Sequence, residues 1–402
     1  MKDLLERFCR YVRIETTADE EADTYPSSSG QTELGRLLVR ELKELGLEAT
    51  IDENSIVTAT LPSTVEHSPT ICWLAHLDTS PEASGKDVDP QVVRGYRGGD
   101  IVLKSGLAIP AQDLTGFEGK TLVTTDGTTL LGADDKAGIA VIMTALDRLL
   151  KQPDRPRCQV RVVFTCDEEI GRGTDRLDLE KIDAVCAYTL DGESAGLIEN
   201  ETFSADVAEV EIEGQNIHPG LAYQKMVNAI RVAGAFLEQL PPEISPEQTQ
   251  GKEPFVHPYV LKGGVDKVTL RILLRSFITS DLAEQAALLK AAARATENDW
   301  PGSSIKVGVK EQYRNMAEFL AKEPRAVALA TEAYRQLGIE PTFKAIRGGT
   351  DGSRLSELGL PTPNLSTGMH NFHSPKEFCC LEEMETAVQV LQELATLWSK
   401  ES

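Results

Sequence analysis

The sequence predicts an α/β fold, in which a mixed, largely parallel sheet flanked by helices carries a smaller, inserted α+β domain. Helical and strand-like hydrophobic periodicities alternate along most of the chain, as they do in proteins with a largely parallel sheet. Near residue 204 the pattern changes to an alternation of apolar and polar residues, which is typical of an antiparallel sheet with one solvated face. The 402 residues also exceed the usual size of one hydrophobic core, so two domains are expected.

The first domain opens with an amphipathic helix and a second helix from about residue 30 to residue 45, which ends at Gly46. Three apolar runs follow at residues 71–75, 160–165 and 185–190, and each predicts a buried strand. Each run leads at its C-terminal end into carboxylate or imidazole side chains. Because α/β sheets usually place their active sites at this edge, we expect these side chains to form one site.

The inserted domain is predicted from two alternating runs, residues 207–213 and 267–276, and from a helix at residues 282–297. We therefore expect an inserted domain over residues 204–314 and a discontinuous first domain formed by residues 1–203 and 315–402.

The composition restricts the class of protein. Hydrophobic residues make up 41% and charged residues 26% of the chain, which is typical of a globular protein and excludes a disordered one. The formal charge of −22, with no Lys/Arg-rich stretch, argues against nucleic acid and membrane as partners. The first residues lack the apolar core of a signal peptide, and the seven cysteines, an odd number, include several in apolar runs. We expect a cytoplasmic protein with reduced cysteines and no membrane span.

Two of the candidate sites combine closely spaced polar residues. His76 and Asp78 follow the first predicted strand two positions apart, so both side chains can project to one side, one binding a metal ion and the other supporting it. Asp134 and Asp135 lie between glycines just before an apolar helix at residues 139–150. One Asp could serve as a helix cap, but two exceed what a cap requires, and a carboxylate held there could bridge two cations.

The other candidates follow the second and third predicted strands or lie late in the chain. An acidic triplet ends in Glu168 and Glu169, which would point to opposite sides of an extended backbone, so that one can bind metal while the other acts as general base. Asp191 follows the third strand. A turn-rich segment supplies His373, with His370 as the alternative.

Together these positions offer two imidazoles and three carboxylates, a set that suits two zinc ions, with manganese or cobalt as substitutes. Two metals that share a carboxylate polarise a carbonyl and generate hydroxide at neutral pH, and hydrolysis of an amide bond needs both. The five candidate ligands are His76, Asp134, Glu169, Asp191 and His373.

Several longer motifs occur in a fixed order along nearly the whole chain. The most specific are TTDG at residues 124–127, LGADDKAG at 131–138 and IRGGTDG at 346–352, and the others are PSSSGQ at 26–31, HLDTSP at 76–81, YRGGD at 96–100 and EF at 377–378. In these motifs the chain resembles the peptidase T family of tripeptide aminopeptidases. That family belongs to a larger clan of dinuclear zinc peptidases, which also holds carboxypeptidases and acylamino-acid deacylases. The resemblance implies a zinc-peptidase catalytic domain, an inserted lid and dimerisation domain, and short peptides with a free N-terminus as substrates.

The resemblance also implies roles for the site residues. Asp134 would bridge two zinc ions, and the ligand pairs of the two sites would be His76 with Asp191 and Glu169 with His373. It implies further that Asp78 orients His76, that Glu168 is the general base, and that the peptide bond after Asp134 is cis.

Three residues outside this cluster are implied to bind substrate. His218 would reach the active site of the partner subunit in a homodimer formed through the inserted domain. Arg275 and Arg347 would bind the terminal carboxylate of the substrate, for which a guanidinium is well shaped.

Two segments depart from the family pattern, Glu193 in a stretch expected to be richer in glycine and Ser374-Pro375 directly after His373. Both lie beside proposed metal ligands, so they bear on the length of peptide that is preferred. The alternatives are another amidohydrolase of the same clan, such as a dipeptidase, carboxypeptidase or deacylase, and a metal-binding module without catalysis. Glu168 beside Glu169 disfavours the last, because a structural zinc site needs no free base.

Overall fold

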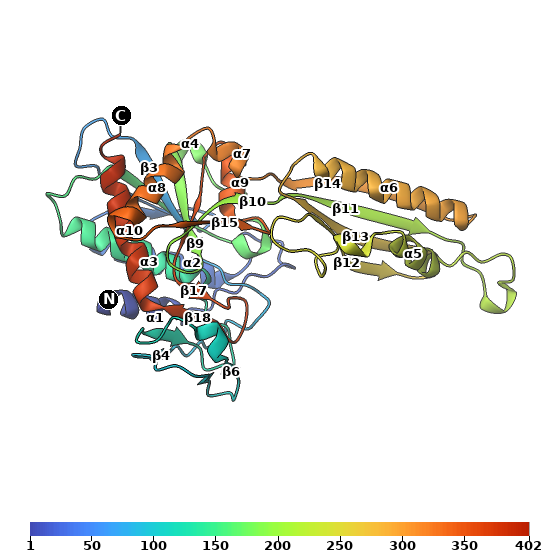
Figure 1. Ribbon diagram of the computed structural model, residues 1–402, viewed down its shortest axis with the longest axis horizontal. Helices are drawn as coiled ribbons and strands as arrows, with labels where there is room; N and C mark the ends of the chain where they lie inside the picture. Colours follow the sequence, from blue (N-terminus) through green and yellow to red (C-terminus); the bar gives the residue numbers. More distant parts are fainter. Residues whose placement is uncertain (402) are drawn as a thin grey trace. The chain divides into compact units, whose positions relative to one another are not determined.

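The computed structural model describes residues 1–401, which form two compact units (Figure 1). The first unit consists of Met1–Asn200, Glu318–Lys344 and the chain from Thr350 onward. The second consists of Glu201–Ala317 and Ala345–Gly349. The sequence placed this last segment in the first domain. In the structure it contacts residues of the second unit, and one of these contacts is the hydrogen bond from Phe203 N to Ile346 O at 3.2 Å.

An eight-stranded sheet forms the centre of the first unit, with the strand order β1-β2-β8-β3-β9-β16-β10-β15. The neighbours β8, β3, β9 and β16 pair in parallel, whereas the β1–β2, β2–β8 and β10–β16 pairs are antiparallel. The mixed sheet predicted from the sequence is thus confirmed, with its parallel pairs together at the centre of the strand order. Its strands are β1 (Glu48–Ile51), β2 (Val57–Leu61), β3 (Thr70–His76), β8 (Gln159–Thr165), β9 (Cys186–Gly192), β16 (Asn364–Ser366), and β10 (Leu197–Thr202) and β15 (Thr342–Ile346), whose last two residues belong to the second unit.

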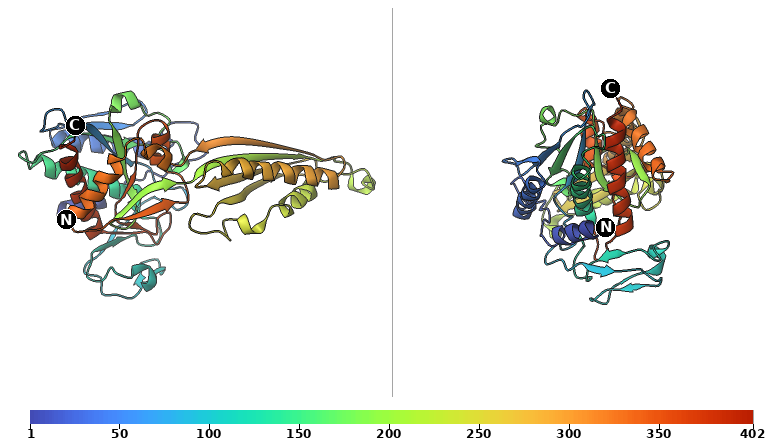
Figure 2. Two further views of the ribbon diagram at one scale, coloured as in Figure 1. Left: turned by 45° about the horizontal axis from the view of Figure 1, so that its top comes forward. Right: turned by 90° about the vertical axis from the view of Figure 1, so that its left-hand side faces the viewer.

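Helices cover both faces of this sheet, because the buried strands alternate their apolar side chains between two cores. On β3, Trp73 and Ala75 belong to the larger core, and Cys72 and Leu74 to the smaller one. The larger core is completed by α1 (Lys2–Tyr11), α2 (Ser29–Glu44), α3 (Ala133–Leu150), α8 (Arg325–Gln336) and α10 (Leu381–Trp398). The smaller core includes side chains from α4 (Leu179–Ile182) and α9 (Asp351–Glu357). Figure 2 shows α10, in red, alongside α8, in orange.

A smaller antiparallel sheet with the order β17-β18-β7-β4 also belongs to the first unit. Its strands are β4 (Gln91–Val93), β7 (Leu122–Thr124), β17 (Met369–His370) and β18 (Phe378–Cys380), and beside it lies the two-stranded sheet of β5 (Ile101–Val102) and β6 (Ala108–Ile109). Side chains from both sheets share one apolar cluster, which includes Phe117 and Phe378. Because β17 and β18 flank the late turn, this cluster anchors the segment that carries His373.

The second unit is an antiparallel sheet with the order β12-β13-β11-β14, packed against two helices. Its elements are β11 (Ser204–Glu213), α5 (Ala229–Glu238), β12 (Phe255–Gly263), β13 (Lys267–Ser276), α6 (Asp281–Asp299) and β14 (Ser304–Tyr313). On β11 the side chains of Val210 and Ile212 are fully buried, whereas Glu209 and Glu213 are exposed. As the sequence predicted, the residues alternate because one face of the sheet is apolar and lies under the helices, whereas the other face is solvated.

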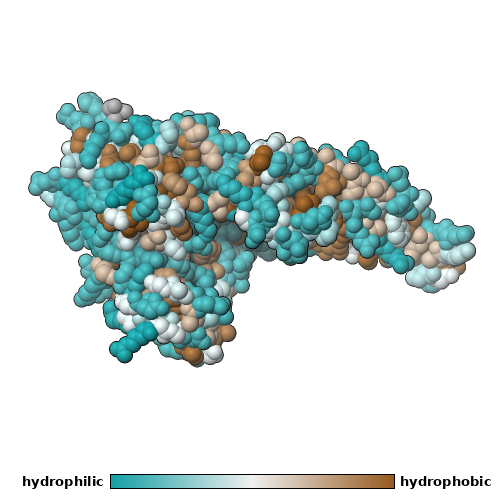
Figure 3. Space-filling model, viewed as in Figure 1, coloured by the Kyte–Doolittle hydropathy of each residue, from teal (hydrophilic) through white to brown (hydrophobic). Residues whose placement is uncertain are grey.

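The surface reflects the charged composition. The face drawn in Figure 3 is mostly hydrophilic, with apolar residues in scattered patches. Within residues 1–401, no helix combines the length and the apolar character needed to cross a membrane.

Candidate metal centre

Three neighbouring strands of the large sheet bring the candidate ligands to one edge. His76 is the last residue of β3, Glu169 lies in a turn of 3-10 helix directly after β8, and Asp191 lies near the end of β9. Because β8, β3 and β9 are adjacent and parallel, their C-terminal ends meet at the same edge. Asp134 comes from the start of α3, which packs on β3 and β9, and His373 comes from the loop between β17 and β18.

The two carboxylate oxygens of Asp134 face two different histidines. Oδ1 lies 2.9 Å from His76 Nε2, and Oδ2 lies 3.3 Å from His373 Nε2. A second carboxylate lies beside each imidazole, since His76 Nε2 is 3.7 Å from Asp191 Oδ1 and His373 Nε2 is 2.9 Å from Glu169 Oε2. The structure therefore brings the five candidate ligands together as two groups of donors that share Asp134.

The backbone at the start of α3 is held against the sheet by Asp135. Its carboxylate accepts hydrogen bonds from His76 N and Gly138 N, both at 3.1 Å. Gly138 has no room for a side chain, because a Cβ there would lie 2.0 Å from Leu190 O. The peptide bond between Asp134 and Asp135 is cis, as the family resemblance implies.

Asp78 has two contacts that matter for the centre. Its carboxylate Oδ1 lies 3.3 Å from His76 Nδ1, which also lies 3.1 Å from Asp78 O, so Asp78 can orient the imidazole. The two carboxylate oxygens also accept hydrogen bonds from Glu168 N and Glu169 N, each at 3.0 Å. Asp78 thus fixes the turn that presents both glutamates, a second contribution that no local sequence pattern indicated.

The carboxylates of the centre repel one another. Burial raises the pKa of the Glu169 carboxyl to about 7, with a further contribution from the charge of Asp134. Burial and the charge of Asp134 likewise raise the pKa of Asp191 well above its ordinary value. Burial would lower the pKa of His76, but the nearby carboxylates of Asp134, Asp191 and Asp78 raise it well above the usual value. A divalent cation would relieve this repulsion and displace the shared protons.

The donor set fits a pair of divalent metal ions. Glu169 Oε1 is buried without a hydrogen-bond partner in residues 1–401, although its other oxygen contacts His373. A buried carboxylate oxygen without a partner is costly unless it binds a cation. Two groups of three potential ligands have donor atoms within 4.8 Å of one another, one formed by His76, Asp134 and Glu169 and the other by His76, Asp135 and Asp191.

The structure places the two late histidines in different surroundings. His373 contacts Asp134 and Glu169, whereas His370 Nε2 lies 2.8 Å from Glu383 Oε2. The His370 ring also stacks on Phe378, with the ring centroids 4.8 Å apart. His370 is therefore engaged with Glu383 and Phe378, whereas His373 lies beside two of the other candidate ligands.

The three residues implied to bind substrate belong to the second unit. His218 is exposed, and its Nδ1 accepts a hydrogen bond from Gly220 N at 3.2 Å. Arg275 is buried, and its Nη1 donates to the backbone carbonyls of Asp206 and Leu274 at 3.0 Å each. The contacts of Arg347 are to Gly251 O at 2.9 Å, Glu253 O at 3.1 Å and Thr249 Oγ1 at 2.8 Å.

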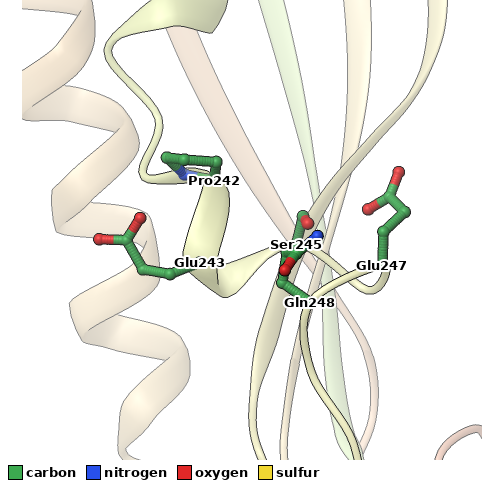
Figure 4. Close-up of a pocket in the computed structure, with 5 residues that line it drawn as sticks. All are labelled: Pro242, Glu243, Ser245, Glu247 and Gln248. Carbon is green, nitrogen blue, oxygen red and sulfur yellow. The ribbon is translucent and has the colours of Figure 1, made fainter.

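The second unit also has an open pocket of about 530 Å³, drawn in Figure 4. In that view the side chains of Glu243 and Glu247 point away from each other, so their carboxylates do not converge on one ligand position. Pro242, Glu243, Ser245, Glu247 and Gln248 line the pocket.

Sequence reasoning missed two residues at the centre. Asp135 was noted only as a neighbour of Asp134, although the doubled aspartate was itself a signal. Glu82, whose Oε2 lies 3.3 Å from His373 Nδ1, had no such signal, because it is an exposed loop glutamate.

Comparisons with known proteins indicate the family of the chain. The sequence profile of peptidase family M20/M25/M40 matches residues 111–397. Peptidase T of Geobacillus thermodenitrificans is 45% identical over 408 aligned positions, which cover 100% of this chain and 99% of the relative. Peptidase T of Bacillus subtilis is also 45% identical, with 98% of each chain covered. The crystal structure of aminopeptidase PepT from Bacillus cereus superposes with a TM-score of 0.78 at 25% identity, over 99% of this chain and 98% of the other.

Proposed function

The chain belongs to peptidase family M20/M25/M40, and from that premise we propose that it is a zinc-dependent aminopeptidase that cleaves the N-terminal residue from short peptides, above all tripeptides. Hydrolysis of peptide bonds follows from membership of the family. The choice of the N-terminal bond is supported by the likeness to an aminopeptidase structure, and the preference for tripeptides by the resemblance to the peptidase T family.

One observation carries the proposal of a dinuclear centre, namely that Asp134 directs one carboxylate oxygen toward His76 and the other toward His373. We propose that Asp134 bridges two zinc ions, with Asp191 and Glu169 as the second carboxylate of each site; manganese or cobalt could substitute for zinc. When bound, such a pair would polarise the scissile carbonyl and lower the pKa of water toward neutrality.

Glu168 is the proposed general base. Its Oε1 accepts a hydrogen bond from Asp351 N at 3.2 Å, and its backbone is held by Asp78, so the orientation of the carboxylate is fixed. Burial raises the pKa of Glu168 well above its ordinary value, with additional contributions from neighbouring carboxylates that include Asp351 and Asp191. A carboxylate of raised pKa is a stronger base toward the attacking water than an ordinary glutamate, and it retains the accepted proton until the leaving amine takes it.

His218 is the proposed donor to the oxyanion that forms at the scissile carbonyl. Because Nδ1 accepts the N–H of Gly220, the proton of a neutral His218 ring is on Nε2, which makes Nε2 a hydrogen-bond donor. We propose that the chain forms a homodimer through its second unit and that His218 serves the active site of the partner subunit. The exposure of the ring supports this proposal, because an exposed donor is available to another chain.

Arg275 and Arg347 are the proposed partners of the terminal carboxylate of the substrate. Arg275 uses Nη1 for two backbone carbonyls, so we assign the carboxylate to its other donors. Arg347 uses both Nη nitrogens to hold residues 249–253, so contact with substrate would require it to exchange these bonds.

The proposed location is the cytoplasm, which agrees with seven free cysteines in the chain. The proposed partners are short peptides with a free N-terminus. A free amine is cationic, and it would be attracted by a chain of formal charge −22.

The test is an assay of purified protein on dipeptides, tripeptides and tetrapeptides, each with a free and an acetylated N-terminus. We expect cleavage of free-amine tripeptides only, loss of activity after chelation, and recovery at about two zinc ions per chain. Cleavage of acetylated peptides at the C-terminal residue would instead identify a carboxypeptidase. Full activity of metal-free protein would exclude the dinuclear mechanism.

A further inference from the structure

One buried carboxylate outside the predicted site binds the loop that carries Asp134. Glu377 lies directly before β18 and is only 1% exposed to solvent. Its Oε2 accepts hydrogen bonds from Leu131 N at 2.6 Å and Gly132 N at 2.8 Å. Its Oε1 accepts a third from Asp134 N at 3.1 Å. Three backbone donors of one short loop therefore converge on a single carboxylate.

The loop needs an outside acceptor because its own backbone is not helical where α3 begins. Gly132 has a φ of 76°, and Asp134 has a ψ of 106°. The first N–H groups of a helix have no acceptor within the helix, and these lie in a buried segment where water cannot replace one. Without Glu377, the N–H groups of Leu131, Gly132 and Asp134 would lose their acceptor.

The loop is also confined by the side chains packed around it. A Cβ on Gly132 would lie 3.2 Å from Thr79 Cγ2 and 3.6 Å from Lys136 Nζ. Lys136 is itself buried and donates to Ile14 O at 2.7 Å. Packed side chains therefore confine the loop, in addition to the carboxylate that accepts its N–H groups.

We infer that Glu377 is a positioning residue, which sets the two carboxylate oxygens of Asp134 between the two metal sites by holding the backbone of residues 131–134. The inference rests on the dinuclear centre proposed above. Glu377 contacts the N–H of Asp134 and not its carboxylate, so it acts through Asp134. A shift of this backbone would move Oδ1 away from His76 and Oδ2 away from His373 together, and it would weaken both sites.

The test is zinc binding to metal-free protein, measured by calorimetry for the wild type and for Glu377→Gln. The substitution keeps the size of the side chain but turns one acceptor oxygen into an NH₂ group that faces backbone donors. We expect the wild type to bind two zinc ions and the variant to bind them about 10- to 100-fold more weakly, as is typical when a residue that supports a metal ligand is changed. Glu377→Asp keeps both oxygens but withdraws them by one methylene, so its affinity should lie between the two. If Glu377→Gln does not fold, the zinc affinity of Glu377→Asp is compared with that of the wild type instead.

Glu383→Gln is the matched control. Glu383 is a buried glutamate six positions further along the chain, with hydrogen bonds to His370 and Lys120. The Glu383→Gln protein should bind zinc with the affinity of the wild type. Thermal unfolding with and without zinc gives a second measurement. A merely structural role would lower the midpoints of the metal-free and zinc-loaded forms equally, whereas a positioning role reduces the gap between them.

Two results would overturn the inference in distinguishable ways. A wild type that binds no pair of zinc ions would overturn the dinuclear centre and this inference with it. A wild type that binds the pair, with an unchanged affinity in Glu377→Gln or an equal loss in Glu383→Gln, would overturn the role of Glu377 alone.

Discussion

Replacement of Glu168 by glutamine separates proton transfer from metal binding. The amide oxygen introduced at this position can still accept the hydrogen bond from Asp351 N, and the two bonds to Asp78 come from backbone N–H groups that the substitution leaves in place. The turn after β8 should therefore keep its shape. What is lost is the ability of this side chain to take a proton, because an amide is not a base at neutral pH.

The expected size of the effect follows from what Glu168 contacts. Within residues 1–401 its side chain has a hydrogen bond to Asp351 N and none to a candidate metal ligand, so the metal content should change little and the loss of rate should come from general-base catalysis. Such catalysis is worth about 10²- to 10⁴-fold in rate, or about 3–5 kcal/mol of barrier. Because burial and neighbouring carboxylates raise the pKa of Glu168, the wild-type rate should also fall on the acid side at a higher pH than for an ordinary glutamate. Glu168→Gln should lack this dependence.

The assay is steady-state hydrolysis of a free-amine tripeptide between pH 5 and pH 9, with the metal content of each sample measured by mass spectrometry. Glu169→Gln is the comparison, because Glu169 lies 2.9 Å from His373 and should lose metal when its charge is removed. The reasoning is refuted if Glu168→Gln retains the wild-type kcat, or if it loses metal as Glu169→Gln is expected to.

Two further predictions concern His218 and Glu199. His218→Ala should lower kcat by about 10²- to 10³-fold without change in metal content, as loss of one oxyanion donor does. When it is mixed with Glu168→Gln under subunit exchange, activity should return to at most about a quarter of wild type, and an inactive mixture of verified heterodimers would contradict a role across the interface. Burial raises the pKa of Glu199 to about 7, so the folded state holds this proton more tightly than the unfolded state. The contribution of this proton to the free energy of unfolding is complete below about pH 4.5 and is lost as the pH rises through about 7. Urea unfolding at a series of pH values should show that the free energy of unfolding falls by about 3 kcal/mol less in Glu199→Gln than in the wild type. Curves of unfolding free energy against pH that run parallel for the two proteins would argue against this prediction.

Local pattern was enough to predict much of the fold and most of the candidate site. The alternation at residues 207–213 predicted an antiparallel strand with one solvated face, because side chains alternate between the faces of a strand with period two. The acids and the imidazole that follow three apolar runs predicted a common site, because the C-terminal ends of parallel strands share one edge. His76, Glu169 and Asp191 are therefore brought together by a rule that can be applied to the sequence alone.

Other features depend on contacts between distant parts of the chain, and no periodicity in the sequence encodes them. The sequence offered His370 as the alternative to His373, and only the structure shows how their surroundings differ, with Glu383 beside the first and Glu169 beside the second. The segment Ala345–Gly349 joins the second unit through its hydrogen bonds, although it follows residues of the first. Glu377 accepts the N–H of Asp134 across 243 positions of sequence. Such pairings form only when the packed sheets and helices bring the partners together, so only the tertiary structure decided them.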